Sequence, residues 1–196
     1  MTISEALEFI KESGGTVSIA ELSANGFKRG SVQHLVNTGR LERSARGVYT
    51  LPGEIEDEFY AIQSRFRRGI FSGNTALYLW GLSDRTPLVY DMTFPSTYNL
   101  GNVKKANIAA VSAIPRFYLL GRTTAITQTG RQVSIYSRER LLCELLRGRK
   151  KEDIQVVSNA FKAYVSSQDR NLTALSSMAE ELHVSQKLRA YLEVLL

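Results

Sequence analysis

Residues 16–51 constrain the fold more than any other part of the chain, because their signals for local structure are strong and closely spaced. Ser18 is followed three positions later by Glu21, a capping-box pattern that marks the start of a helix. The pair Asn25-Gly26 is a common helix terminus, so this helix is expected to cover only residues 19–24. A short β-prone run comes directly before it.

A second helix and a hairpin follow at once. The helix is predicted from about Lys28 to Thr38, where Gly39 ends it. Two short strands, 41–44 and 48–51, are expected on either side of the turn Ala45-Arg46-Gly47. The order helix, turn, helix and basic hairpin predicts a winged helix-turn-helix.

The rest of the sequence indicates a second, mixed region. A first helix, which we expect Ser4 to cap, precedes the winged segment. Pro52-Gly53 marks the end of the winged segment. We therefore expect an α+β protein with a winged helix-turn-helix at 1–53 and a mixed C-terminal domain at 54–196, with a small sheet and a helical end. In the second domain we predict helices ending near 68 and at 74–80, 138–146, 153–166, 172–182 and 185–195, and strands at 89–94, 116–120, 123–127 and 132–136.

Composition narrows the partners and the compartment. The formal net charge is +6, and the basic residues are concentrated between residues 60 and 151, which favours a polyanionic partner. Cys143 is the single cysteine, so an intrachain disulfide and a cysteine-based zinc site are excluded. The N-terminus lacks the pattern of a secretory signal and no apolar run could span a bilayer, so we expect a cytoplasmic protein without a membrane partner.

The second helix of the winged segment is the expected reading element for DNA. Val32, Leu35 and Val36 are spaced to face the core, which turns the polar positions of this helix towards solvent. Gln33 and Asn37 lie four positions apart and share one face, and side-chain amides suit the donor and acceptor of adenine in the major groove.

The candidate DNA-binding residues form two groups. Base reading is expected from Lys28, Ser31, Gln33 and Asn37, with His34 either touching DNA or solvated. Phosphate and wing contacts are expected from Arg29, Arg40, Arg43 and Arg46. A fold of this kind can instead bind protein, so an interaction module remains an alternative.

The same segment also resembles a known family, the AbiEi antitoxins. The residues that carry the resemblance are Ala20-Glu21-Leu22, Gly26, Leu35-Val36, Gly39-Arg40-Leu41, Arg46-Gly47-Val48-Tyr49 and Pro52-Gly53. Two further segments, 71–82 and 91–95, resemble the start of the second domain of that family. The resemblance extends over about residues 14–95 and is weaker beyond them.

The resemblance implies a role that the composition does not. It implies an antitoxin of a type IV toxin–antitoxin pair, linked to abortive infection by phage, that represses its own operon through the N-terminal domain. The implied functional partner is a toxin resembling a nucleotidyltransferase, which type IV antitoxins oppose without a stable complex. The implied DNA partner is promoter DNA, and winged-helix repressors often use paired sites, so inverted repeats are expected. Direct binding of the toxin remains open, as does a free-standing transcriptional regulator without a toxin.

Three other features of the sequence are weaker indications of function. A basic run, which comprises Arg147, Arg149, Lys150 and Lys151, could form a second phosphate-binding surface, favour the end of a helix dipole or be solvated. Asp91 with downstream lysines faintly suggests a metal-dependent nuclease, but such a site needs more carboxylates than lie nearby. Cys143 lies in an apolar run and is expected to be buried and structural. No cofactor, metal or catalytic residue is expected, since the chain has neither a P-loop nor a dinucleotide-binding glycine motif.

Overall fold

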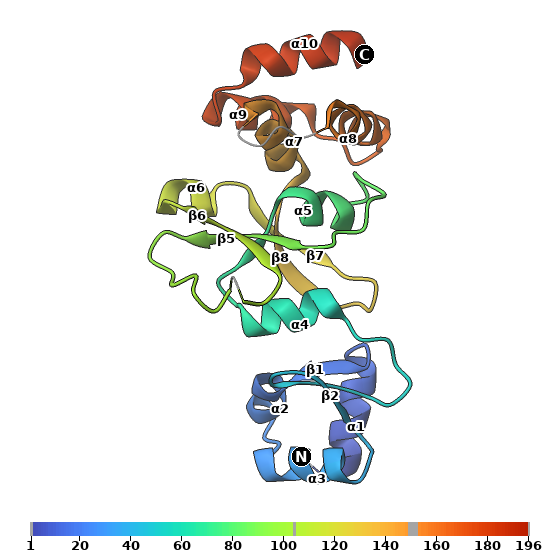
Figure 1. Cartoon of the computed structure of the whole chain (residues 1–196). Helices are drawn as coiled ribbons and strands as arrows, with labels where there is room; N and C mark the ends of the chain where they lie inside the picture. Colours follow the sequence, from blue (N-terminus) through green and yellow to red (C-terminus); the bar gives the residue numbers. More distant parts are fainter. Residues whose placement is uncertain (1, 104, 149–152, 196) are drawn as a thin grey trace. The chain divides into compact units, whose positions relative to one another are not determined.

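The computed structural model describes residues 2–103, 105–148 and 153–195, and in it the chain folds into two compact units. The first unit holds the chain through Arg67 together with Ile126–Val133, and the second holds Arg68–Ala125 and the chain from Ser134 onward. Helices and strands alternate irregularly along both, as Figure 1 shows, so the predicted α+β class is confirmed. No helix among the described residues is long and apolar enough to cross a membrane.

The first unit has the predicted winged-helix order. Its elements are α1 (Ile3–Glu12), β1 (Thr16–Ser18), α2 (Ile19–Ala24), α3 (Arg29–Asn37), β2 (Glu42–Ala45), β3 (Val48–Thr50) and α4 (Glu58–Arg65). The three strands form one antiparallel sheet in the order β1-β3-β2. The predicted assignment of DNA binding to residues 1–53 and of the antitoxin role to 54–196 stays a prediction.

Local caps explain where the first helices begin. Ser18 accepts a hydrogen bond from the Glu21 amide at 3.2 Å, and its own amide donates to the Glu21 carboxylate at 2.9 Å, so the predicted capping box is confirmed. The predicted cap at Ser4 is wrong, because the helix starts earlier. Thr2 caps α1 and forms a second capping box with Glu5. The acid three positions after the cap was the better signal.

The core of the first unit joins α1, α2, α3 and β1. The side chains of Leu22 and Leu35 are fully buried at the centre, which fixes the two helices of the helix-turn-helix against each other. The other buried members are Ala6, Ile10, Val17, Phe27, Val32 and Leu41. Val48 packs with Tyr60 and Ala61, so α4 packs against the wing strand β3.

The second unit is built on a five-stranded mixed sheet followed by a helical end. Its elements are β4 (Ile70–Phe71), α5 (Gly73–Leu79), β5 (Tyr90–Pro95), β6 (Ile108–Ala113), α6 (Pro115–Leu119), β7 (Arg122–Ile126), β8 (Gln132–Tyr136), α7 (Arg138–Arg147), α8 (Ile154–Ser166), α9 (Leu172–Glu181) and α10 (Ser185–Leu195). The strand order is β6-β5-β4-β8-β7, with β4 antiparallel to β5 and parallel to β8. Strand β6 pairs in parallel with β5 over its whole length.

Three elements of this unit differ from the prediction. The expected strand at 116–120 is wrong, because Pro115 is placed at the first position of a helix, where its fixed φ and missing N–H favour α6. Strands β4 and β6 were not predicted. β4 has only two residues, and half of the residues of β6 are alanine, so neither shows the alternating apolar and polar pattern of a strand.

Helix α7 is the centre of the helical end. It packs against α5, α8, α9 and α10, and its buried side chains include Leu141, Leu142 and Cys143. Ser137 caps its first turn by accepting a hydrogen bond from the Arg140 amide. The indole of Trp80 donates a hydrogen bond of 2.8 Å to the carbonyl of Tyr136, which ties the end of α5 to strand β8.

Candidate nucleic-acid interface

Helix α3 presents one face to the core and the other to solvent. Val32 and Leu35 are almost fully buried, and Val36 is half-buried against the same core, so the predicted inward face is confirmed. Gln33 and Asn37 are exposed on the opposite side. Because three apolar side chains are held in the core, α3 cannot turn its polar face inward without losing that packing.

The two amides on this face already contact each other. Nε2 of Gln33 donates a hydrogen bond of 2.9 Å to Oδ1 of Asn37, which holds both side chains in one orientation. The pair then offers the Nδ2 donor of Asn37 and the Oε1 acceptor of Gln33. One donor beside one acceptor is the pattern that matches the N7 and N6 edge of adenine.

The first turn of α3 contains no acidic residue. Lys28 occupies the cap position without a side-chain hydrogen bond. The other helices before Arg67 begin differently, since α1, α2 and α4 carry Glu5, Glu21 and Glu58 in their first turns. The positive end of the α3 dipole is therefore uncompensated and flanked by exposed Lys28 and Arg29, an arrangement that favours a phosphate.

The wing adds further positive charge. Strands β2 and β3 meet at Arg46-Gly47, where Gly47 has a φ of +76° that a side chain would strain. Arg40, Arg43 and Arg46 are all exposed between the end of α3 and this turn. Glu42 is the single acid in the sequence from residue 28 to residue 46.

The remaining candidates of this surface have mixed environments. Ser31 is half-buried near the start of α3, which limits its reach. His34 is exposed, and its backbone carbonyl accepts a hydrogen bond from the Thr38 hydroxyl at 2.9 Å. The fold thus brings the nine candidate residues onto one helix, the loop after it and one hairpin, while their contact with DNA stays a prediction.

The predicted second basic surface, at residues 147–151, lies partly outside the residues that the structure describes. Arg149, Lys150 and Lys151 lie outside the described residues. Arg147 is half-buried in the last turn of α7, and its guanidinium lies 5.7 Å from the centre of the Phe117 ring. Arg147 therefore packs on an aromatic ring within its own unit, and a phosphate-binding role for the run stays a prediction.

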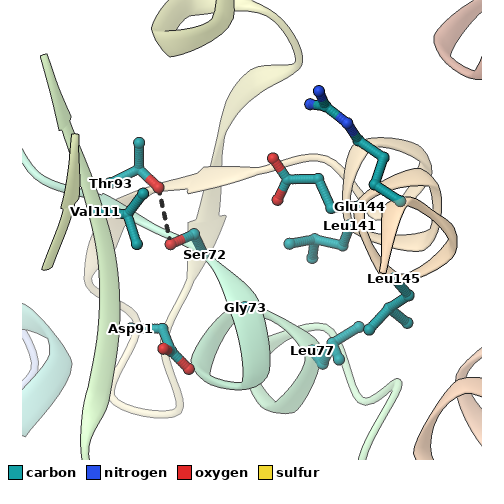
Figure 2. Close-up of a pocket in the computed structure, with 10 residues that line it drawn as sticks. Ser72, Gly73, Leu77, Asp91, Thr93, Val111, Leu141, Glu144 and Leu145 are labelled. Carbon is teal, nitrogen blue, oxygen red and sulfur yellow. Dashed lines mark hydrogen bonds between the residues drawn. The ribbon is translucent and has the colours of Figure 1, made fainter. Parts of the chain in front are cut away.

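A pocket of about 180 Å³ opens in the second unit beside Asp91 (Figure 2). Two hydroxyls of its lining, those of Ser72 and Thr93, lie 3.0 Å apart, and the carboxylate of Asp91 accepts the Asn74 amide at 3.0 Å. Asp91 thus caps the first turn of α5. Within the described part of the chain, no group of three or more His, Cys, Asp or Glu is placed to hold a metal.

Cys143 has the environment of a structural residue, as the sequence predicts. Its side chain is fully buried, and its Sγ donates to the Leu175 carbonyl at 3.8 Å. Burial, reinforced by nearby Glu139 and Glu144, raises the pKa of the thiol to about 12. A thiol that stays protonated at neutral pH is a poor nucleophile.

Comparisons with known proteins bear on the family and the fold. Residues 5–88 match the model of a family described as "Transcriptional regulator, AbiEi antitoxin N-terminal domain". No curated protein sequence matches the chain. The crystal structure of the RV2827C protein from Mycobacterium tuberculosis is similar with a TM-score of 0.50 and 14% identity, covering 97% of this chain and 80% of that one. At that identity the likeness concerns the fold alone.

Proposed function

We propose that the chain represses its own operon by binding promoter DNA, because residues 5–88 match the AbiEi antitoxin N-terminal domain of transcriptional regulators. Helix α3 would lie in the major groove, where Gln33 and Asn37 would read base edges with Lys28, Ser31 and His34 near them. Arg29, Arg40, Arg43 and Arg46 would contact phosphates or a flanking minor groove. Inverted repeats would match two copies of the chain bound to DNA.

One observation supports this proposal above the others. The outward face of α3 joins an orientated amide pair to a helix N-terminus without an acid, beside a basic hairpin. A protein-binding face of the same fold would not need donors, acceptors and positive charge in this combination. DNA requires all three, because phosphates set affinity and base edges set sequence preference.

The antitoxin role is the second part of the proposal. We infer from the family that the chain opposes a nucleotidyltransferase-like toxin, in a type IV pair that acts in abortive infection by phage. The C-terminal region would carry this role without a stable complex and without catalysis, in the cytoplasm. Co-expression with the product of a neighbouring nucleotidyltransferase-like gene tests it: growth rescue supports an antitoxin, and absence of rescue leaves a free-standing regulator.

The test of DNA binding is a salt titration. The purified chain is titrated against the DNA upstream of its own gene and against scrambled DNA of the same composition, from 50 to 300 mM salt. Sequence-selective and salt-steep binding is the expected result. Equal or absent binding to both DNAs would remove the repressor proposal.

Variants separate the two kinds of contact. Arg43→Ala with Arg46→Ala should reduce the slope of log K against log salt by roughly 2, since each phosphate contact contributes about 0.9. Gln33→Ala should leave that slope unchanged and lower the preference for the operator about tenfold. Lys162→Ala, at an exposed lysine of α8, is the matched control and should change neither.

A further inference from the structure

Residues Ile126–Val133 belong to the first unit although they follow α4 by some 60 positions in the chain. They form the tip between β7 and β8, closed by a hydrogen bond of 2.8 Å from the Thr127 amide to the Arg131 carbonyl. The tip lies very close to the end of α1. A Cβ on Gly14 would stand 2.1 Å from the carbonyl oxygen of Thr129, so only glycine fits at that position.

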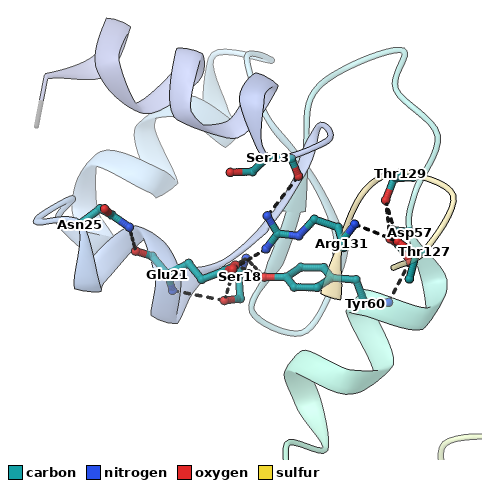
Figure 3. Close-up of polar contacts among 9 residues, drawn as sticks. All are labelled: Ser13, Ser18, Glu21, Asn25, Asp57, Tyr60, Thr127, Thr129 and Arg131. Carbon is teal, nitrogen blue, oxygen red and sulfur yellow. Dashed lines mark hydrogen bonds and ion pairs between the residues drawn. The ribbon is translucent and has the colours of Figure 1, made fainter. Parts of the chain in front are cut away.

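One anchor of the tip is Asp57, the cap of α4. Its Oδ1 accepts the amide of Tyr60 at 2.9 Å, and its Oδ2 accepts the hydroxyls of Thr127 and Thr129 (Figure 3). Asp57 is only 4% exposed. A buried carboxylate needs hydrogen-bond donors in place of water, and two of these three come from the tip.

The second anchor is the guanidinium of Arg131, whose side chain is 11% exposed. It donates to the carbonyl of Ser13 at 3.1 Å and forms an ion pair with Glu21 (Figure 3). It also lies 3.9 Å from the centre of the Tyr60 ring. The hydroxyl of Tyr60 donates to the same Glu21 carboxylate. One side chain therefore joins the end of α1, the start of α2 and one face of α4.

Glu21 is the residue through which this contact reaches the reading helix. It is the third residue of α2 and half of that helix's capping box. Helix α2 packs on α3 through the common core of Leu22 and Leu35. A displacement of the start of α2 would therefore be transmitted to α3, because a packed core transmits strain rather than absorbing it.

We propose that Arg131 is a positioning residue for DNA binding, which acts through Glu21 to set the orientation of α2 and α3. The inference rests on the proposed function and deepens it, because operator recognition by residues 28–46 would then require a segment that lies far outside the N-terminal domain. The Arg131 side chain is 11% exposed and the Glu21 side chain 37%, so the ion pair is held at a partly buried position between the tip and α2.

The test compares Arg131→Ala with wild type in the full chain, well below the melting temperature. Affinity for the operator should fall about tenfold, the cost of losing one base contact. Affinity for scrambled DNA and the salt slope should not change, because Arg131 would touch no phosphate. Arg131→Lys, which keeps the charge without the planar fork, should recover only part of the loss. Arg122→Ala, an exposed arginine of β7, is the matched control and should bind as wild type.

Two further variants make the outcome decisive. In a Glu21→Gln background, Arg131→Ala should cause little additional loss of operator affinity, since both changes remove the ion pair through which Arg131 is proposed to act. Thr127→Val with Thr129→Val removes the other anchor at nearly constant volume and should act in the same direction. A reduced salt slope for Arg131→Ala would identify a phosphate contact and overturn the proposal, as would unchanged operator affinity. If wild type itself shows no operator preference, the proposed function fails instead.

The positioning role also has a readout that does not involve DNA. Hydrogen exchange of the α2 amides should accelerate in Arg131→Ala, while exchange in α8 should remain as in wild type. Faster exchange throughout the first unit, with equal loss of binding to both DNAs, would mean general destabilisation and would also overturn the proposal.

Discussion

The loss of the Arg140 guanidinium should destabilise the second unit strongly. Arg140 is 3% exposed, and its Nη1 donates at 2.7 Å to the carbonyls of both Phe117 and Leu120. Its Nε and Nη2 donate to the Glu144 carboxylate at 3.0 and 2.8 Å, and its guanidinium lies 4.3 Å from the centre of the Tyr136 ring. The side chain thus ties α7 to the end of α6.

The expected loss in the free energy of unfolding follows from the polar groups that Arg140→Ala leaves without a partner. Breaking a buried ion pair costs about 3–5 kcal/mol, because the remaining polar groups lose their partner without regaining water. The Glu144 side chain is 33% exposed and can be rehydrated, so its part of this cost is discounted. The two carbonyls that Arg140 contacts lose a charged donor, at about 1.5 kcal/mol each at the low end. We expect a loss of about 3 kcal/mol in the free energy of unfolding.

The assay uses the single tryptophan of the chain. Trp80 belongs to the second unit, so its fluorescence reports the unfolding of that unit in a urea titration. The control is Arg116→Ala, which removes an exposed ion pair with Glu181 and should cost under about 1 kcal/mol. If Arg140→Ala costs no more than the control, the argument that Arg140 holds α6 and α7 together is refuted.

Three other outcomes are expected in the second unit. Burial raises the pKa of Tyr136 and Tyr164 to about 12 from an ordinary value of 10, so the stability that their neutral forms contribute is complete below pH 10 and lost as the pH rises towards 12. Urea titrations from pH 8 to 11 should show this decline, and a flat profile would contradict it. Cys143 should resist alkylation at pH 8 in the folded chain and react fully in 8 M urea, whereas rapid native labelling would show that it is accessible. Gly73→Ala should cost about 1–3 kcal/mol, since φ is +51° and the new Cβ would lie 2.9 Å from the Asp91 carboxylate; unchanged stability would show that the turn can relax.

Much of the first unit could be predicted because its signals are local. The capping box of Ser18 and Glu21 is complete within four residues, so no distant part of the chain is needed to recognise it. The apolar spacing of Val32 and Leu35 determines which face of α3 is buried, and therefore which side chains are offered to a partner. The same kind of local signal marks the start of α1, where Thr2 and Glu5 form a complete capping box and Ser4 alone does not.

The second unit was harder because its elements depend on partners. Strand β4 has two residues, and it exists because β5 and β8 pair on either side of it. Strand β6 lacks apolar alternation and is held by six pairs with β5. The run at residues 116–120 looks β-prone by composition, but Pro115 favours a helix start, and the Leu120 and Phe117 carbonyls then meet Arg140.

The sequence by itself determined the winged-helix segment, the outward face of α3 and the burial of Cys143, because caps and apolar periods act over a few residues. Only the tertiary structure decided that the tip at 126–133 belongs with the first unit. Arg131 meets Glu21 across 110 positions of chain, and no local pattern marks either residue for the other. Their pairing depends on the close approach of the tip to the end of α1, which Gly14 permits, and this approach is a property of the folded chain alone.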